Sequence, residues 1–347
     1  MSVPVHASAG DPTPAKDGQT PPRQCVRPVL ASRVAMLLKH ENDTRQGGDA
    51  EALHDMRVAS RRLREALEVF AFCFPVKSYD KLARRARLVT RALGELRNAD
   101  VAIAYFETLR SQSDNVLVKV ALEDVLRRLG REQREARRGL QQRLNQARLD
   151  RLPNDLGDAC TRAESTPLRY QRGARRSITL ARKVLLQRLR ELFAAQGAVG
   201  GEQDEKNLHR VRITVKKLRY AVETLDYAVG TALVAHLGLL RQWQDVLGAL
   251  HDRDVLAVRV RRRLQKIQQQ LPGSLLETGM QAVLDQMVRE RHAAYDEYLM
   301  LAGELDQKQW RKYFVPPPAS ATLTGRQERR EGMEEKADSN GRKRFAQ

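Results

Sequence analysis

The stretch Leu53–Arg64, LHDMRVASRRLR, returns further along the chain as Leu208–Arg219, LHRVRITVKKLR. A second stretch, LGELRNADV at Leu93–Val101, returns as LGALHDRDV at Leu247–Val255, at almost the same separation. The segment preceding each copy of the first stretch also aligns with its counterpart without a gap. Three landmarks in the same order at nearly constant spacing predict an internal duplication.

The composition predicts an all-α fold. Hydrophobic residues make up 41% of the chain and aromatic residues only 5%, and helix-forming Leu, Ala, Arg, Glu and Gln dominate its middle. Strand-like alternation is hard to find. The spacing predicts about four helices per half, with Gly94 as a helix stop and Asn98 as the following cap. The four predicted helices of the first half cover residues 26–40, 51–74, 78–93 and 98–109, and a long helix at 116–149, ended by Pro153, follows them. Those of the second half cover residues 168–195, 204–229, 231–248 and 252–270, with a closing helix at 274–313.

Two tails frame this helical region. Residues 1–24 are rich in Pro, Gly, Ala and Thr, and residues 315–347 open on a proline run and continue with mixed charges, so we expect both to be disordered. The region between them, 25–314, is predicted to be one duplicated domain. Its first half covers about 25–155 and its second about 165–314.

The charge balance indicates a polyanionic partner. Lys and Arg number 62 against 43 acidic residues, a formal charge of +19. Such a chain usually meets nucleic acid, an anionic membrane surface or polyphosphate. Three scattered cysteines fit a reducing compartment, and the sequence shows neither a signal peptide nor a stretch that could insert into a membrane. We therefore expect a cytoplasmic protein.

The repeated stretch places a row of basic side chains on one helix face in each half. At about 100° per residue, the His, the first two Arg and the last Arg of the first copy project within about 80° of one another. Because like charges on one face repel, a row preserved in register twice favours an anionic ligand. The two predicted rows are His54, Arg57, Arg61, Arg62 and Arg64, and His209, Arg212, Lys216, Lys217 and Arg219.

With these motifs the sequence resembles the CHAD family, the conserved histidine α-helical domain. The resemblance covers about 26–313 and is carried by L-H-x-x-R-[VI]-x-x-[RK]-[RK]-L-R and L-G-x-L-x-[ND]-x-D-V, each present twice. It implies two pseudo-twofold-related four-helix bundles of long antiparallel helices, with a basic groove between them that binds inorganic polyphosphate. It also implies that the ten residues of the two rows line that surface, and it makes polyphosphate granules a candidate location.

The sequence departs from the family pattern in two respects. Arg97 and Asn98 stand where His251 and Asp252 stand in the other half, so a role that needs both carboxylates is unsafe. Many relatives carry a catalytic CYTH domain with an E-x-E-x-K strand before the helical domain. That motif does not occur here, and the preceding residues are too few for the domain. We therefore expect a stand-alone, non-catalytic binding domain without a cofactor.

Three other functions are weighed against polyphosphate binding. Nucleic-acid binding is the first alternative, but aromatic residues for base stacking are scarce and no recognition signature occurs. A phosphohydrolase or kinase is the second, but the basic rows lack an adjacent carboxylate cluster for Mg²⁺. A metal site of His251, Asp252 and Asp254, joined by His209, is the third; capping and ion pairing explain these residues better.

Overall fold

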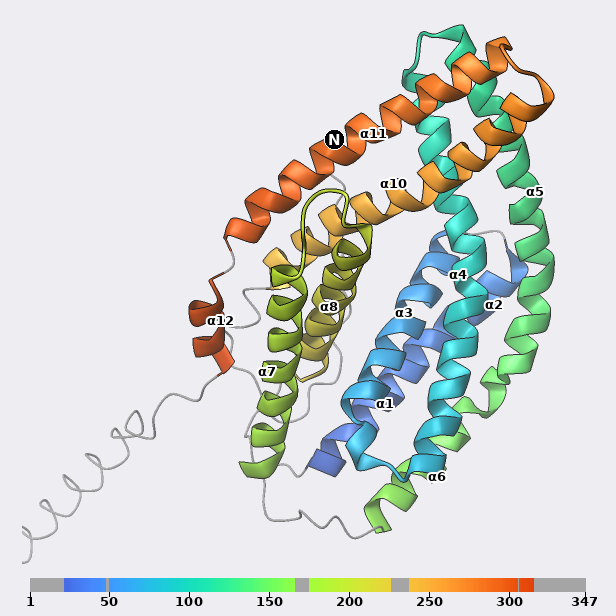
Figure 1. Cartoon of the computed structure of the whole chain (residues 1–347). Coiled ribbons are helices and arrows are strands. Elements are labelled where there is room, and N and C mark those ends of the chain that lie inside the picture. Colours follow the sequence, from blue (N-terminus) through green and yellow to red (C-terminus); the bar gives the residue numbers. More distant parts are fainter. Residues whose placement is uncertain (1–21, 48–49, 166–174, 226–236, 305, 315–347) are drawn as a thin grey trace, which may run out of the picture.

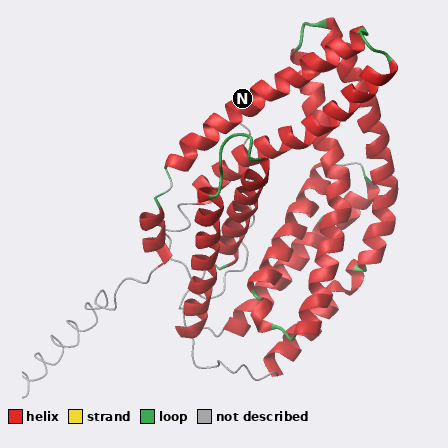
Figure 2. Cartoon of the chain, viewed as in Figure 1, coloured by secondary structure: helices red, strands yellow, loops and turns green. Residues whose placement is uncertain are grey.

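The computed structural model describes residues 22–47, 50–165, 175–225, 237–304 and 306–314, and this part of the chain is helical without a strand (Figures 1 and 2). The all-α prediction is therefore confirmed. The helices are α1 (Pro22–Lys39), α2 (Glu41–Gln46), α3 (Ala50–Val69), α4 (Val76–Gln112), α5 (Val116–Ala147), α6 (Leu152–Ser165), α7 (Arg175–Gly197), α8 (Glu205–Thr224), α10 (Leu237–Gln270), α11 (Leu275–Gly303) and α12 (Gln307–Phe314), with 3-10 turns η1 (Ala71–Cys73) and η2 (Leu149–Arg151).

The predicted break at Gly94 is wrong, because α4 continues through it and through Asn98. In the same way α10 continues through the break predicted between residues 248 and 252. A glycine inside a helix costs about 1 kcal/mol relative to alanine, which tertiary packing readily offsets. Here Leu93 and Leu96 are buried on either side of Gly94, so packing carries the helix across it.

Other boundaries also differ from the prediction. Helix α6 was not predicted, and Pro153, expected to end a helix, lies in its first turn, where a missing N–H costs nothing. Helix α1 begins at Pro22, inside the stretch expected to be disordered, and the predicted closing helix is divided into α11 and α12. The rest of both predicted tails, and predicted helix residues 168–174 and 226–236, lie outside the described residues.

The two halves share their hydrophobic core. One cluster joins α1, α3, α6, α7 and α8 with parts of α4, α5, α10 and α11. A second cluster is built from the remaining parts of α4 and α5 of the first half with α10 and α11 of the second. Each copy of the basic stretch lies on a central helix, α3 or α8, and each copy of the second landmark on the long helix packed against it, α4 or α10. The pseudo-twofold relation between the halves stays a prediction.

The apolar side chains of the central helices and of α10 face the interior. Leu63 and Leu67 on α3, and Leu218 and Val222 on α8, are buried, as are Phe70 directly after α3 and Trp243 on α10. The basic rows are thereby turned away from the apolar faces of their helices. None of the helices that the structure describes is both long and apolar enough to cross a membrane.

Gly279 of α11 lies against the backbone of α5. A Cβ at this position would lie 2.2 Å from the backbone oxygen of Leu117. We expect Gly279→Ala to lower the free energy of unfolding by about 2 kcal/mol, since the clash is with backbone that can relieve it only by moving a helix. Gly157→Ala in α6, where the added methyl group meets nothing within 4 Å, is the matched control and should change stability by about 1 kcal/mol at most, in the stabilising direction. Denaturant unfolding of both variants measures the difference, and equal stabilities would contradict this account of the crossing.

Candidate anion-binding site

Helices α3 and α8 are in contact, which brings the two basic rows together. Tyr220 of α8 is buried beneath them, with a guanidinium from each helix over its ring. The guanidinium carbon of Arg61 lies 5.8 Å from the ring centroid and that of Arg219 lies 4.7 Å from it. The rows therefore meet at a shared aromatic side chain.

The centre of this surface consists of closely spaced cations with no carboxylate at ion-pair distance in the described residues. Arg57, Arg61, Arg212 and Lys216 make no ion pair with a carboxylate within the described part of the chain. We call these four residues the inner cations. The buried Nε atoms of the three arginines also have no hydrogen-bond acceptor. Buried donors left unsatisfied cost free energy, and an anion bound here would supply the missing hydrogen-bond acceptors.

The inner cations perturb one another. Burial, followed by the charges of Arg61, Arg212 and Arg97, lowers the pKa of Arg57 to about 10. Burial and the charge of Arg61, against the opposing effect of Asp252, lower the pKa of Arg212. Each lowered pKa reflects two effects of the fold. The guanidinium groups are partly removed from water, and they lie close to other positive charges.

The other end of the rows is neutralised by carboxylates. Arg62 and Arg219 both lie near Glu223, at 3.5 and 3.7 Å, and Lys217 pairs with Glu68 at 3.0 Å. Glu68 also accepts from Arg188 of α7 at 2.5 Å. Arg64 in turn pairs with the buried Glu65 at 3.3 Å. Arg62, Arg64, Lys217 and Arg219, the outer cations, are thus partly compensated before any ligand arrives.

A cavity of about 320 Å³ opens beside the inner cations. It adds side chains from α4 and α10 to those of α3 and α8. Arg97 and His251 were not predicted to be part of the anion-binding site. Both lie in the repeated second landmark, and that repetition is the sequence signal that could have identified them. The lining residues are His54, Arg57, Arg97, Asn98, Val101, Ala102, Arg212, His251, Asp252, Val255 and Leu256.

The predicted row residue His209 contacts His251 of α10. Their Nδ1 atoms lie 3.1 Å apart, so one neutral ring donates and the other accepts. Burial, with the charges of Arg212, His209 and Lys216, lowers the pKa of His251 to about 4, and burial also lowers the pKa values of His209 and His54. The histidines are therefore neutral hydrogen-bonding groups at pH 7, and a phosphate nearby would favour their charged forms.

The carboxylates of the hypothetical metal site have separate partners. Asp254 accepts from Arg291 of α11 at 2.5 Å. Asp252 lies near Arg212, and burial raises its pKa. Among the residues that the structure describes, no three His, Cys, Asp or Glu side chains form a group that could hold a metal ion.

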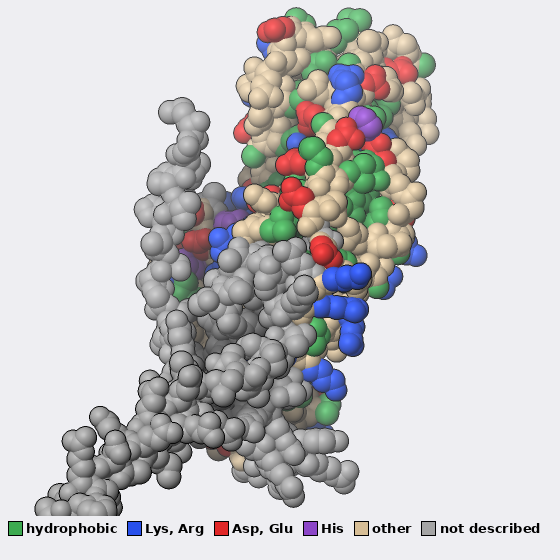
Figure 3. Space-filling view, turned by 90° about the vertical axis from the view of Figure 1, so that its left-hand side faces the viewer, with side chains coloured by type: hydrophobic (Ala, Val, Ile, Leu, Met, Phe, Trp, Pro, Cys, Tyr) green, Lys and Arg blue, Asp and Glu red, His purple; other side chains and the backbone are tan. Residues whose placement is uncertain are grey.

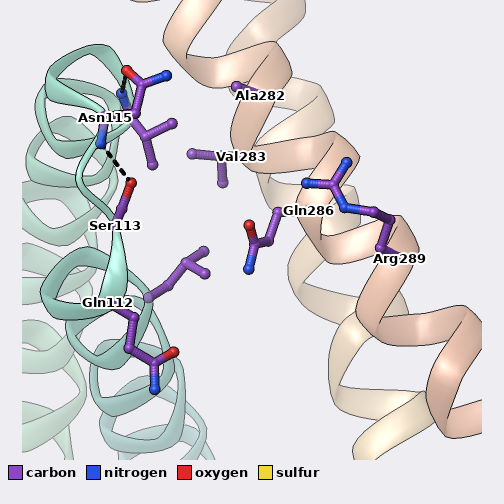
Figure 4. Close-up of a pocket in the computed structure, with 9 residues that line it drawn as sticks. Gln112, Ser113, Asn115, Ala282, Val283, Gln286 and Arg289 are labelled. Carbon is purple, nitrogen blue, oxygen red and sulfur yellow. Dashed lines mark hydrogen bonds between the residues drawn. The ribbon is translucent and has the colours of Figure 1, made fainter.

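A second pocket, of about 220 Å³, lies between the α4–α5 turn and α11 (Figure 4). Its polar rim includes Gln112, Asn115 and Gln286, and Arg289 is its one cation. On the surface shown in Figure 3, acidic and basic side chains mix in the upper part, whereas Lys and Arg form a row along the lower right edge. Positive charge is thus concentrated regionally, and the second pocket lacks the density of cations found between α3 and α8.

Comparisons with known proteins agree with this fold. The chain matches the family model of the CHAD domain over residues 28–261. It is similar to the crystal structure of the CHAD domain from the plant Ricinus communis, with a TM-score of 0.63 and 22% identity, covering 87% of this chain and 98% of that one. It is also similar to PptA from Streptomyces chartreusis, with a TM-score of 0.56 and 16% identity, covering 82% and 100%. No match was found among curated protein sequences.

Lys216 gives the free protein a pH dependence that can be measured. Burial, then the charge of Arg61, and further those of Arg212 and Arg64, lower its pKa to about 7 against the opposing effect of Glu65. An unfolded lysine titrates near about 10.4, so between these pH values the unfolded state binds more protons and this group makes stability rise with pH. We expect Lys216→Met to be more stable than the unchanged protein at pH 7, with the difference shrinking toward pH 10.

Denaturant unfolding across this pH range, in buffers without phosphate or sulfate, provides the measurement. The free energy of unfolding is compared between the unchanged protein and Lys216→Met at each pH. Titrating groups that both proteins share cancel in this difference, which leaves the contribution of Lys216. A difference that does not vary with pH would show that Lys216 is an ordinary, fully charged lysine in the folded protein.

Proposed function

Because this chain belongs to the CHAD family, we propose that it binds inorganic polyphosphate without catalysing its conversion. The ligand would lie along α3 and α8, with its phosphates against the inner cations and the adjoining cavity. The observation that carries the proposal is the cluster of Arg57, Arg61, Arg212 and Lys216, half-buried and without ion-pair partners in the described chain. A closely charged linear anion satisfies several such donors at once.

The geometry favours bare phosphate over nucleic acid. Bases bound as single strands usually stack on exposed aromatic rings. The aromatic residue at this surface, Tyr220, is only 2% exposed and is covered by guanidinium groups. Arginine forks can instead bind two oxygens of a phosphate each, which needs no base.

A non-catalytic role is supported by the composition of the cavity. Asp252 is the one carboxylate among its lining residues. Enzymes of phosphoryl transfer generally use several acidic groups to hold Mg²⁺ and to position the nucleophile. The charges that line this cavity suit retention of a phosphate chain more than its cleavage.

Neutralising one inner cation from each helix tests the site. We expect Arg57→Gln with Arg212→Gln to weaken binding of polyphosphate at least about 100-fold, since each charge-assisted contact contributes about 1.5–3 kcal/mol. Isothermal titration at fixed salt measures the affinity, and circular dichroism verifies that the variant is helical. Arg131→Gln with Arg138→Gln, on the exposed face of α5, removes the same charge elsewhere and should bind almost normally.

The same preparation distinguishes the alternatives. Equal loss in both double variants would mean that net charge alone attracts the ligand. Retention of DNA in preference to polyphosphate in a direct competition would favour the nucleic-acid alternative. Orthophosphate released from polyphosphate in the presence of Mg²⁺, and lost in the Arg57→Gln, Arg212→Gln variant, would make the protein an enzyme.

We further propose that the protein resides in the cytoplasm and collects on polyphosphate granules. A fluorescently tagged chain should be granular in cells that make polyphosphate and diffuse in cells that cannot synthesise it. The double variant at Arg57 and Arg212 should stay diffuse in both. Granular fluorescence that persists without polyphosphate would contradict recruitment by this ligand.

A further inference from the structure

Helix α4 carries a second set of cations outside the predicted rows. Arg84, Arg87 and Arg91 are exposed, and none makes an ion pair with a carboxylate within the described part of the chain. Their neighbours Lys81 and Arg85 do, each at 2.8 Å from Asp155. The nearby carboxylate is thus taken by the flanking residues, and the positive charge of the three arginines stays uncompensated.

These arginines share a helix face with the wall of the cavity. At about 100° per residue, Arg84, Arg87, Arg91 and Asn98 project within about 60° of one another. Asn98 lines the cavity. The three arginines therefore lie on one strip of α4 that leads from the cavity toward the start of the helix, over roughly 10 Å at 1.5 Å per residue.

Two contacts show that this strip runs beside the row on α3. The hydroxyl of Thr90 lies 3.2 Å from that of Ser60, and a Cβ on Gly94 would lie 4.0 Å from Nε of Arg57. The two helices are therefore antiparallel, with Arg57 beside Gly94 and Ser60 beside Thr90. One turn further, the same register brings Arg64 level with Arg87.

The strip has no equivalent in the second half. Counted back from the second landmark, the corresponding positions of α10 are Gly238, Arg241 and Asp245, which carry no net charge. The surroundings of the cavity are therefore asymmetric, because three arginines without ion pairs extend along α4 whereas the corresponding positions of α10 carry no net charge.

We propose that Arg84, Arg87 and Arg91 form an outer track that takes up the part of a polyphosphate chain extending beyond the cavity. The track rests on the function proposed above and adds a dependence on chain length. A short phosphate chain fills the space at the inner cations and the cavity, and does not extend to Arg91, Arg87 and Arg84. A long chain engages both places at once, so the second contact is intramolecular and raises the affinity.

The test compares tripolyphosphate with a long-chain polyphosphate at low salt. The triple variant Arg84→Gln, Arg87→Gln, Arg91→Gln should bind tripolyphosphate as the unchanged protein does. Its affinity for the long chain should fall roughly tenfold, the scale expected for three exposed ion pairs. The fall should diminish as salt rises, because exposed charges are screened.

A matched control comes from α5. Arg131, Arg134 and Arg138 are exposed, make no ion pair with a carboxylate in the described residues, and repeat the spacing of the α4 row. The triple variant to Gln at these positions removes the same charge and should leave binding of both ligands unchanged. An equal loss in both triple variants would reduce the track to a net-charge effect and overturn it.

The remaining outcomes separate this inference from the function on which it rests. If the α4 variant keeps full affinity for the long chain while Arg57→Gln with Arg212→Gln loses both ligands, the track is wrong and polyphosphate binding stands. If the unchanged protein binds neither ligand, both fail. If the α4 variant loses retention of duplex DNA but not of polyphosphate, the strip is a nucleic-acid surface and the track is overturned.

Discussion

Like charges held together at the contact of α3 and α8 govern the chemistry of this molecule. Arg57, Arg61 and Arg212 would repel one another in any arrangement, and burial makes the repulsion stronger. The opposite faces of the same helices carry the buried leucines and valines of the shared core, which keep the two helices in place. Contact of two guanidinium groups with the ring of Tyr220 offsets part of the cost. The core thus maintains a positive surface that its own side chains do not neutralise.

The outer cations complement this arrangement. Glu68 of α3 pairs with Lys217 of α8 and with Arg188 of α7, while Glu223 of α8 lies between its own neighbour Arg219 and Arg62 of α3. Three of these four ion pairs cross between helices, so they hold together at one end the faces that the inner cations push apart at the other. The repeated sequence pattern therefore contains two kinds of cation, and the positions of Glu65, Glu68 and Glu223 decide which of them are left unpaired.

Helical periodicity and duplication were enough to predict the basic rows, because both signals lie within a short stretch of chain. The division into inner and outer cations could not be predicted in this way, since it depends on carboxylates and on the contact of helices far apart in the sequence. The continuous helix at Gly94 escaped prediction for a similar reason. Its local signal is that of a helix end, whereas the buried neighbours on both sides and the nearby guanidinium of Arg57 favour an uninterrupted helix without a side chain there.

In the free protein, the repulsion between the positive charges is reduced because some of its basic groups are partly or fully deprotonated near pH 7. Lys216, one of the inner cations, has a pKa of about 7. The neutral pair His209 and His251 lies beside the inner cations. An arriving phosphate chain would reverse this balance, because its charge favours the protonated forms of all three groups. Under the proposed function, binding at the centre would therefore be coupled to proton uptake and would strengthen as the pH falls. Contacts of a ligand with exposed arginines such as those of α4 would respond mainly to salt, because exposed charges are screened. Proton concentration and ionic strength would thus act on different parts of the proposed binding surface, the first on its half-buried centre and the second on its exposed margin.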